Sequence, residues 1–282
     1  MAPATIDARS PIGVFDSGVG GLTVLAALCE RLPQERFVYL GDTARLPYGI
    51  KSPETVVRYA LQAADALVRR GVKALVIACN TASAVALPAI AERYGSMPLM
   101  GVVEPGAAAA AAASRTGQIA VLGTEATVRG GAYQRAISHH RPDAQIRAIA
   151  CQLFVALAEE GWTEGPIARA TAERYLSSLV SPTGSAHGFV ADTLVLGCTH
   201  FPMLSAAIRA VIGDGVRLVD SAVTTAQATR EVLLAQRLLA ANAPAGTRVQ
   251  LLATDGAERF AAVGTRFLGR QIAPAEVELV DL

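Results

Sequence analysis

The sequence predicts an α/β protein with two similar domains, each containing a mostly parallel sheet flanked by helices. Short segments rich in Val, Ile and Leu alternate with longer amphipathic segments along the chain, as strands alternate with helices in this class. The short segments are continuously apolar, which is typical of parallel strands that helices cover on both faces. Two of them end in a cysteine followed by polar residues, so the same arrangement occurs twice.

Eight segments are candidate strands, and helical patterns lie between them. The strands are predicted at 12–16, 37–41, 74–78, 98–103, 119–123, 146–150, 193–197 and 216–220, and helices at 21–32, 52–71 and 166–180. Proline and glycine interrupt the pattern near 102–106, where the chain is expected to cross between domains. The return is expected near 219–221. The first domain is therefore predicted to comprise 1–103 and 219–282, and the second domain 104–218.

Composition limits the class of protein. Of the 282 residues, 52% are hydrophobic and 17% are charged, so the chain can bury a large core. The formal net charge of +1 gives no reason to expect a nucleic-acid partner or an anionic membrane surface. The opening residues lack the pattern of a signal peptide, and no apolar run approaches the roughly 20 residues of a membrane span. We therefore expect a cytoplasmic protein.

Polar side chains follow four of the predicted strands, and open α/β sheets bind ligands at the carboxyl ends of their strands. The four clusters are Asp16 and Ser17, Asp42 with Tyr48 and Gly49, Cys79 with Asn80 and Thr81, and Cys198 with Thr199 and His200. The glycine-rich loop after Asp16 matches neither a dinucleotide-binding fingerprint nor a P-loop, and glycines also permit a tight turn and close packing. The mixture of neutral donors with an acid favours a small zwitterion as ligand.

Cys79 and Cys198 are the candidate catalytic thiols, whereas Cys29 and Cys151 are expected to pack. The four cysteines are far apart in the sequence, which favours free thiols in a reducing compartment. Two thiols that flank one carbon suit a reaction in which one removes a proton and the other returns a proton to the opposite face. His200 is a candidate acid–base partner for Cys198.

Asp16 needs a different role, because a carboxylate beside a thiol raises the pKa of that thiol. It is predicted to accept a proton or to face the ammonium group of the ligand. A two-domain protein that binds an amino acid without catalysis is an alternative. A metal or redox site at Cys79, Cys198 and His200 is a further one, although structural zinc sites usually have four ligands at short spacings.

These residues resemble the motifs of the glutamate racemases, in the aspartate/glutamate racemase family. The resemblance covers nearly the whole chain, through FDSGVGGLTVL (15–25), GDTARLPYG (41–49), ACNTASA (78–84), VLGT (121–124), LGCTHFP (196–202) and LVDSA (218–222). It implies an active site in the cleft between two domains and the conversion of L-glutamate to D-glutamate for peptidoglycan synthesis. It also implies no pyridoxal phosphate, no metal, and a homodimer. An aspartate or hydantoin racemase of the same superfamily is the alternative.

The resemblance also implies roles for single residues. Cys198 would take the proton from L-glutamate and Cys79 the proton from D-glutamate. Asp16 and His200 match the groups that assist the two thiols, and Glu159 matches a further acidic residue of the site, with the adjacent Glu160 as the alternative. The implied substrate contacts are Asp16, Ser17, Tyr48, Gly49, Asn80, Thr81, Thr124, Thr199 and His200.

Overall fold

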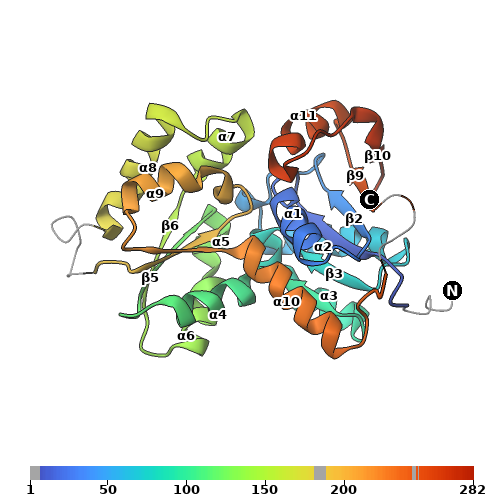
Figure 1. The fold of residues 1–282 in the computed structure, drawn as a ribbon, viewed down its shortest axis with the longest axis horizontal. Helices are drawn as coiled ribbons and strands as arrows, with labels where there is room; N and C mark the ends of the chain where they lie inside the picture. The colour runs from blue at the N-terminus through green and yellow to red at the C-terminus, as the bar shows by residue number, and fades with distance from the viewer. Residues whose placement is uncertain (1–6, 181–188, 243–245, 247) are drawn as a thin grey trace.

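The computed structural model describes residues 7–180, 189–242, 246 and 248–282, which form two α/β units side by side (Figure 1). The first unit has a sheet of six strands in the order β10-β9-β2-β1-β3-β4, and the second unit has a sheet of four strands in the order β6-β5-β7-β8. Every strand pairing among these residues is parallel. The predicted α/β class with two parallel sheets is confirmed.

Both faces of the first sheet are covered by helices. Its strands are β1 (Ile12–Asp16), β2 (Phe37–Gly41), β3 (Ala74–Ile77), β4 (Leu99–Gly101), β9 (Val249–Ala253) and β10 (Val277–Leu279). Helices α2 (Pro53–Val68) and α3 (Asn80–Tyr94) cover one face, and α1 (Leu22–Arg31), α10 (Ser221–Ala235) and α11 (Ala257–Leu268) cover the other. Consecutive residues of β1 alternate between the two cores, with Val14 in one and Phe15 in the other. This explains the continuously apolar sequence.

The second sheet is built in the same way. Its strands are β5 (Gln118–Gly123), β6 (Gln145–Ala150), β7 (Thr193–Gly197) and β8 (Arg217–Asp220). Helices α4 (Val103–Ala113) and α6 (Ala132–His140) cover one face, and α7 (Gln152–Glu160), α8 (Gly165–Val180) and α9 (Ser205–Ile212) cover the other. The short helix α5 (Glu125–Gly130) follows β5, and 3-10 turns form at η1 (Tyr48–Ile50), η3 (Phe201–Leu204) and η4 (Pro274–Glu276).

One hydrophobic cluster joins the two units. It contains Val14 and Tyr39 of the first sheet together with Leu122 and Leu196 of the second. Helix α10 packs on α1 of the first unit and also contacts α4, β7 and β8 of the second, and Figure 1 shows it crossing between the units. The relative position of the two sheets is therefore supported by buried apolar contact.

The predicted elements correspond to observed ones, with two omissions. All eight predicted strands are present, although the strand predicted at 98–103 is limited to β4 (Leu99–Gly101). Strands β9 and β10 were not predicted. In β9 the second residue, Gln250, is exposed, and β10 is an edge strand of three residues with two of them exposed. Neither segment shows the long apolar run of a central strand.

The chain passes between the units twice. It leaves the first sheet after β4 and enters α4 at Val103, and it leaves the second sheet at the end of β8. Val219 and Asp220 of β8 pair with Val195 and Leu196 of β7. The predicted boundary between 218 and 219 therefore lies inside a strand of the second sheet. Among the described residues, no helix combines the length and the apolar character needed to cross a bilayer.

Candidate active site

A cavity of about 300 Å³ lies between the two units, beyond the carboxyl ends of β1, β3, β5 and β7. This volume suits a small molecule. The predicted site residues that line it are Ser17, Tyr48, Gly49, Cys79, Asn80, Thr81, Thr124, Glu159, Cys198, Thr199 and His200. The polar clusters that the sequence separates by up to about 180 residues thus meet around one space, and both candidate thiols face it.

Cys79 joins strand β3 to helix α3. Its backbone turns at the N-cap of α3, and its Sγ accepts a hydrogen bond from Ala82 N at 3.5 Å while donating to Ser17 Oγ at 3.5 Å. Burial and the negative charge of Asp16 raise the pKa of Cys79 to about 12, against the opposing effect of these two contacts. Cys79 is therefore a neutral thiol that can donate a proton.

Cys198 lines the same cavity from the second unit, in the turn between β7 and η3. Its Sγ lies 3.9 Å from His200 Nδ1, and His200 Nε2 donates to Glu159 Oε1 at 3.0 Å. Burial opposes protonation of His200, but the contacts with Cys198 and Glu159 outweigh it and raise the pKa of His200 to about 10. The hydrogen bond from His200 lowers the pKa of Glu159. His200 and Glu159 therefore form an imidazolium–carboxylate pair beside Cys198.

Asp16 ends strand β1 and is fully buried behind the cavity wall, next to Ser17, which lines the wall. Its Oδ2 accepts from Gly18 N at 2.9 Å, while its Oδ1 has no partner within the described residues. Burial raises the pKa of Asp16, partly offset by the charge of His200. A buried carboxylate oxygen without a donor is costly, so Asp16 is suited to take a proton or to accept a hydrogen bond from a ligand.

The glycine-rich loop after Asp16 allows the two units to approach closely. A Cβ atom at Gly20 would lie 2.3 Å from Thr199 Oγ1 and 2.4 Å from His200 Cε1. Thr23 Oγ1 in turn donates to Thr199 O at 3.0 Å. Glycine is therefore required at position 20 by the contact with the turn that carries Cys198.

Asp42 holds the loop that carries Tyr48 and Gly49. Its Oδ2 accepts from Tyr48 OH and from Arg45 Nε, at 2.7 Å for the latter, and its Oδ1 accepts from Thr254 Oγ1 at 2.9 Å. These bonds fix the wall of the cavity on the side of the first unit. A Cβ atom at Gly49 would lie only 2.9 Å from Thr124 Cβ of the second unit, so glycine is needed there as well.

Hydroxyl and amide groups form another wall of the cavity. Thr81 Oγ1 lies 3.1 Å from Thr124 Oγ1 and 3.3 Å from Thr127 Oγ1, and Thr124 Oγ1 caps the N-terminus of α5. Asn80 Oδ1 accepts from Tyr133 OH at 2.7 Å, while its Nδ2 has no partner in the described part of the chain. Such a set of neutral donors suits a carboxylate group.

Helix α7 supplies a face of the cavity from which only Glu159 was predicted. Gln152, Val155, Ala156 and Glu159 line the cavity and recur at the i, i+3, i+4, i+7 spacing of one helical face, a signal that was available in the sequence. Glu160 does not lie on that face and is exposed. Leu46 and Pro47 also line the cavity. Thr127 and Tyr133 were missed because neither follows a strand.

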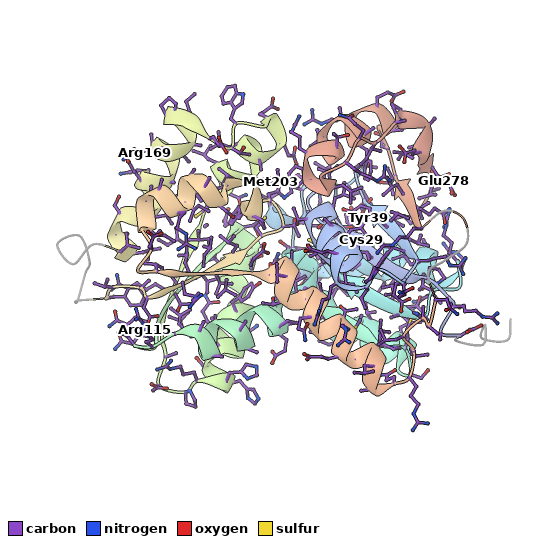
Figure 2. The ribbon with its side chains drawn as sticks, viewed as in Figure 1. Cys29, Tyr39, Arg115, Arg169, Met203 and Glu278 are labelled. Atoms are coloured by element: carbon purple, nitrogen blue, oxygen red, sulfur yellow. The ribbon has the colours of Figure 1, made fainter. Side chains whose placement is uncertain are left out.

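Cys29 and Cys151 lie outside the cavity. Cys29 is on α1 in the first unit (Figure 2) and is partly buried against the core. Cys151 is fully buried, and its thiol donates to Ile149 O at 3.6 Å. No three side chains of His, Cys, Asp or Glu are grouped to hold a metal ion anywhere in the described ranges.

The sequence profile of the Asp/Glu/Hydantoin racemase family matches residues 16–229. The chain belongs to this family. Glutamate racemase from Geobacter metallireducens is 50% identical over 261 residues, with 93% of each chain covered. The glutamate racemase of Neisseria meningitidis serogroup A is 46% identical over 279 residues, with 98% of each chain covered.

Solved structures of racemases have the same fold. Glutamate racemase from Thermus thermophilus in complex with β-chloro-D-alanine has a TM-score of 0.85 at 46% identity, with 98% of both chains covered. The Francisella tularensis glutamate racemase in complex with D-glutamate has a TM-score of 0.86 at 34% identity, with 97% of this chain and 98% of that chain covered. The predicted resemblance to the racemase family, and with it the assignment to the isomerases, is confirmed.

Proposed function

We propose that this protein interconverts L-glutamate and D-glutamate and supplies D-glutamate for peptidoglycan synthesis. The observation that carries this proposal is that Cys79 and Cys198 belong to different units and line one small cavity. Cys79 is near the carboxylate of Asp16, and Cys198 is near the imidazolium of His200. The relatives that match nearly the whole chain are glutamate racemases, so glutamate is proposed ahead of aspartate or a hydantoin.

In the direction from L to D, Cys198 removes the proton from Cα and Cys79 returns a proton to the opposite face. The Cα–H bond breaks toward the sulfur of Cys198, and a new Cα–H bond forms from the thiol of Cys79. The enzyme then has a thiol at Cys198 and a thiolate at Cys79. The reverse reaction restores the starting state, and exchange with water does so after product release.

The partners of each thiol suit these steps. The imidazolium of His200, 3.9 Å from Cys198 Sγ, stabilises negative charge on that sulfur. In the direction from D to L, where Cys79 must act as a thiolate, Asp16 is proposed to accept the proton of Cys79 beforehand, since burial raises the pKa of Asp16 and it has a free Oδ1. Glu159 keeps His200 oriented and charged through Nε2. We assign this function to Glu159 rather than to Glu160.

The substrate is held by the neutral groups of the cavity. Asn80 Nδ2 and the hydroxyls of Thr81, Thr124 and Thr199 are proposed to donate to its carboxylates. Ser17, Tyr48 and Gly49 are proposed to complete the contacts from the first unit. Because chain residues supply every proton transfer, we propose that the reaction needs neither pyridoxal phosphate nor a metal.

Solvent exchange at Cα tests this proposal. Purified protein incubated with L-glutamate in deuterium oxide, without added cofactor, should incorporate deuterium at Cα while forming D-glutamate. Cys79→Ser and Cys198→Ser should each reduce kcat by about 10²–10⁴-fold, the range of a lost proton-transfer group, with binding of glutamate retained. Binding without exchange in the parent protein would instead identify a non-catalytic binding protein. Conversion that requires added pyridoxal phosphate would exclude the two-thiol mechanism.

The remaining features of the proposal concern specificity and assembly. L-aspartate and a hydantoin, assayed beside L-glutamate, should be poor substrates. The resemblance described above supports a cytoplasmic homodimer, and light scattering of the purified protein measures whether its mass is twice that of the 29.2 kDa chain.

A further inference from the structure

Tyr133 is a fully buried residue of α6 that none of the steps above uses. Its ring lies close to two glycines of neighbouring elements. A Cβ atom at Gly197, at the end of β7, would lie 3.0 Å from Tyr133 Cε2, and one at Gly106 in α4 would lie 3.3 Å from Tyr133 Cε1 and OH. The ring is therefore packed so closely that the position of its hydroxyl is well defined.

The hydroxyl of Tyr133 reaches across to the first unit. It donates to Oδ1 of Asn80 at 2.7 Å, and Asn80 is the first residue of α3, directly after Cys79. Burial raises the pKa of Tyr133, so the phenol retains its proton. A phenol that donates its proton to Asn80 requires the amide to present its oxygen, which directs the NH₂ group the other way.

The amide nitrogen of Asn80 is the informative atom. It is buried and has no hydrogen-bond partner among the described residues, although Asn80 itself lines the cavity. A buried N–H group without an acceptor is unfavourable. The missing acceptor is therefore expected from the ligand, and an anionic oxygen is the acceptor that binds most strongly.

We propose that Tyr133 is a positioning residue that fixes the amide of Asn80 with its NH₂ group toward the cavity, where it donates to a carboxylate oxygen of the substrate. This inference rests on the proposed function for the identity of the substrate. Without the phenol, the amide of Asn80 is free to rotate and to present its oxygen to the carboxylate, which opposes binding. Tyr133 thus acts on the substrate through Asn80 and does not touch it.

Tyr133→Phe removes the hydroxyl and keeps the ring. Loss of a hydrogen bond to the substrate weakens its binding, so KM rises. We expect KM to rise about tenfold for both enantiomers, the effect of one lost hydrogen bond. A purely structural role would instead reduce the active fraction and lower kcat at constant KM.

Tyr94→Phe is the matched control. The hydroxyl of Tyr94 also bonds to a side chain, that of Asp65, but Tyr94 lies at the end of α3 away from the cavity. Its removal should leave KM unchanged. Thermal unfolding of both variants shows whether either one is misfolded.

A double-mutant cycle with Asn80→Ala separates a role through Asn80 from any other role. In the Asn80→Ala background, Tyr133→Phe should change KM by less than about twofold. The same tenfold change in both backgrounds, or an unchanged KM in Tyr133→Phe alone, would overturn the inference. The dissociation constant of D-glutamate, measured by calorimetry, should follow KM. If the parent protein binds but does not racemise glutamate, the proposed function fails, while a tenfold weaker binding by Tyr133→Phe still supports the role of Tyr133.

Discussion

Replacing Glu159 by glutamine should make the reaction more sensitive to high pH. Glu159 Oε1 accepts from His200 Nε2 at 3.0 Å, and this contact helps to hold the pKa of His200 at about 10. The imidazolium is present below that pKa and is lost as the pH rises through it. Removing the negative charge lowers the pKa of His200, so the imidazolium beside Cys198 is lost at a lower pH.

The magnitude follows from the difference between charged and neutral hydrogen bonds. A bond to a charged group contributes about 1.5–3 kcal/mol and a neutral bond about 0.5–1.5 kcal/mol. Glutamine keeps an acceptor oxygen for His200, so the loss is about 1–1.5 kcal/mol. At 1.36 kcal/mol per pH unit, the alkaline limb of kcat/KM for L-glutamate should move by about one pH unit to lower pH.

The assay is the pH dependence of kcat/KM, measured for the parent protein, Glu159→Gln and Glu160→Gln. Glu160 is exposed and lies outside the cavity, so its variant is the matched control and should retain the profile of the parent protein. An unchanged alkaline limb in Glu159→Gln, or an equal displacement in Glu160→Gln, would show that the carboxylate of Glu159 does not maintain the imidazolium.

Two further predictions concern stability. Gly20→Ala introduces a Cβ atom 2.3 Å from Thr199 Oγ1 and should destabilise the protein by about 1–3 kcal/mol while lowering racemase activity. Gly130→Ala is the control, because there is open space around its Cβ position, and it should change neither stability nor activity. Equal thermal unfolding and activity in the two variants would contradict the close contact at Gly20. Lys73→Met leaves Glu35 buried without the ammonium group now 2.5 Å from its Oε2 and should cost about 3–5 kcal/mol in urea unfolding. Lys73→Met combined with Glu35→Leu should recover most of the lost free energy of unfolding. A Lys73→Met variant as stable as the parent protein would show that buried Glu35 does not need the ammonium group of Lys73.

The alternating pattern of short apolar and longer amphipathic segments was sufficient to predict the fold class. Central strands such as β1 and β7 are buried on both faces, so nearly every residue in them is apolar and the signal is strong. The edge strand β10 is short and its outer residues are exposed, so its sequence carries little information. The strand predicted at 216–220 is observed as β8 (Arg217–Asp220), whereas the return to the first domain was expected inside this strand, at 219, because a polar residue at a strand end looks the same as the start of a connection.

Within one parallel sheet, polar residues at strand ends could be predicted to meet because the strands end at the same edge. Cys79 and Cys198 were found as strand-end residues of two different sheets, and the cleft that joins these sheets was expected only from the resemblance. Tyr133 and Thr127 could not be found, because they lie on helices and reach the site only through the packing of one unit on the other. The two thiols differ in their surroundings: Cys79 is near Asp16, and Cys198 is near His200 and Glu159. This difference also depends on distances that the sequence does not contain.

The division of the cavity between two sheets means that neither half of the protein has a complete site. Each sulfur belongs to a different unit, so under the proposed two-thiol mechanism a small rotation of one unit about the other would move one sulfur away from the substrate carbon. The close contact of Gly20 with Thr199 is expected to keep the two units at the spacing that this mechanism needs, although neither residue exchanges a proton.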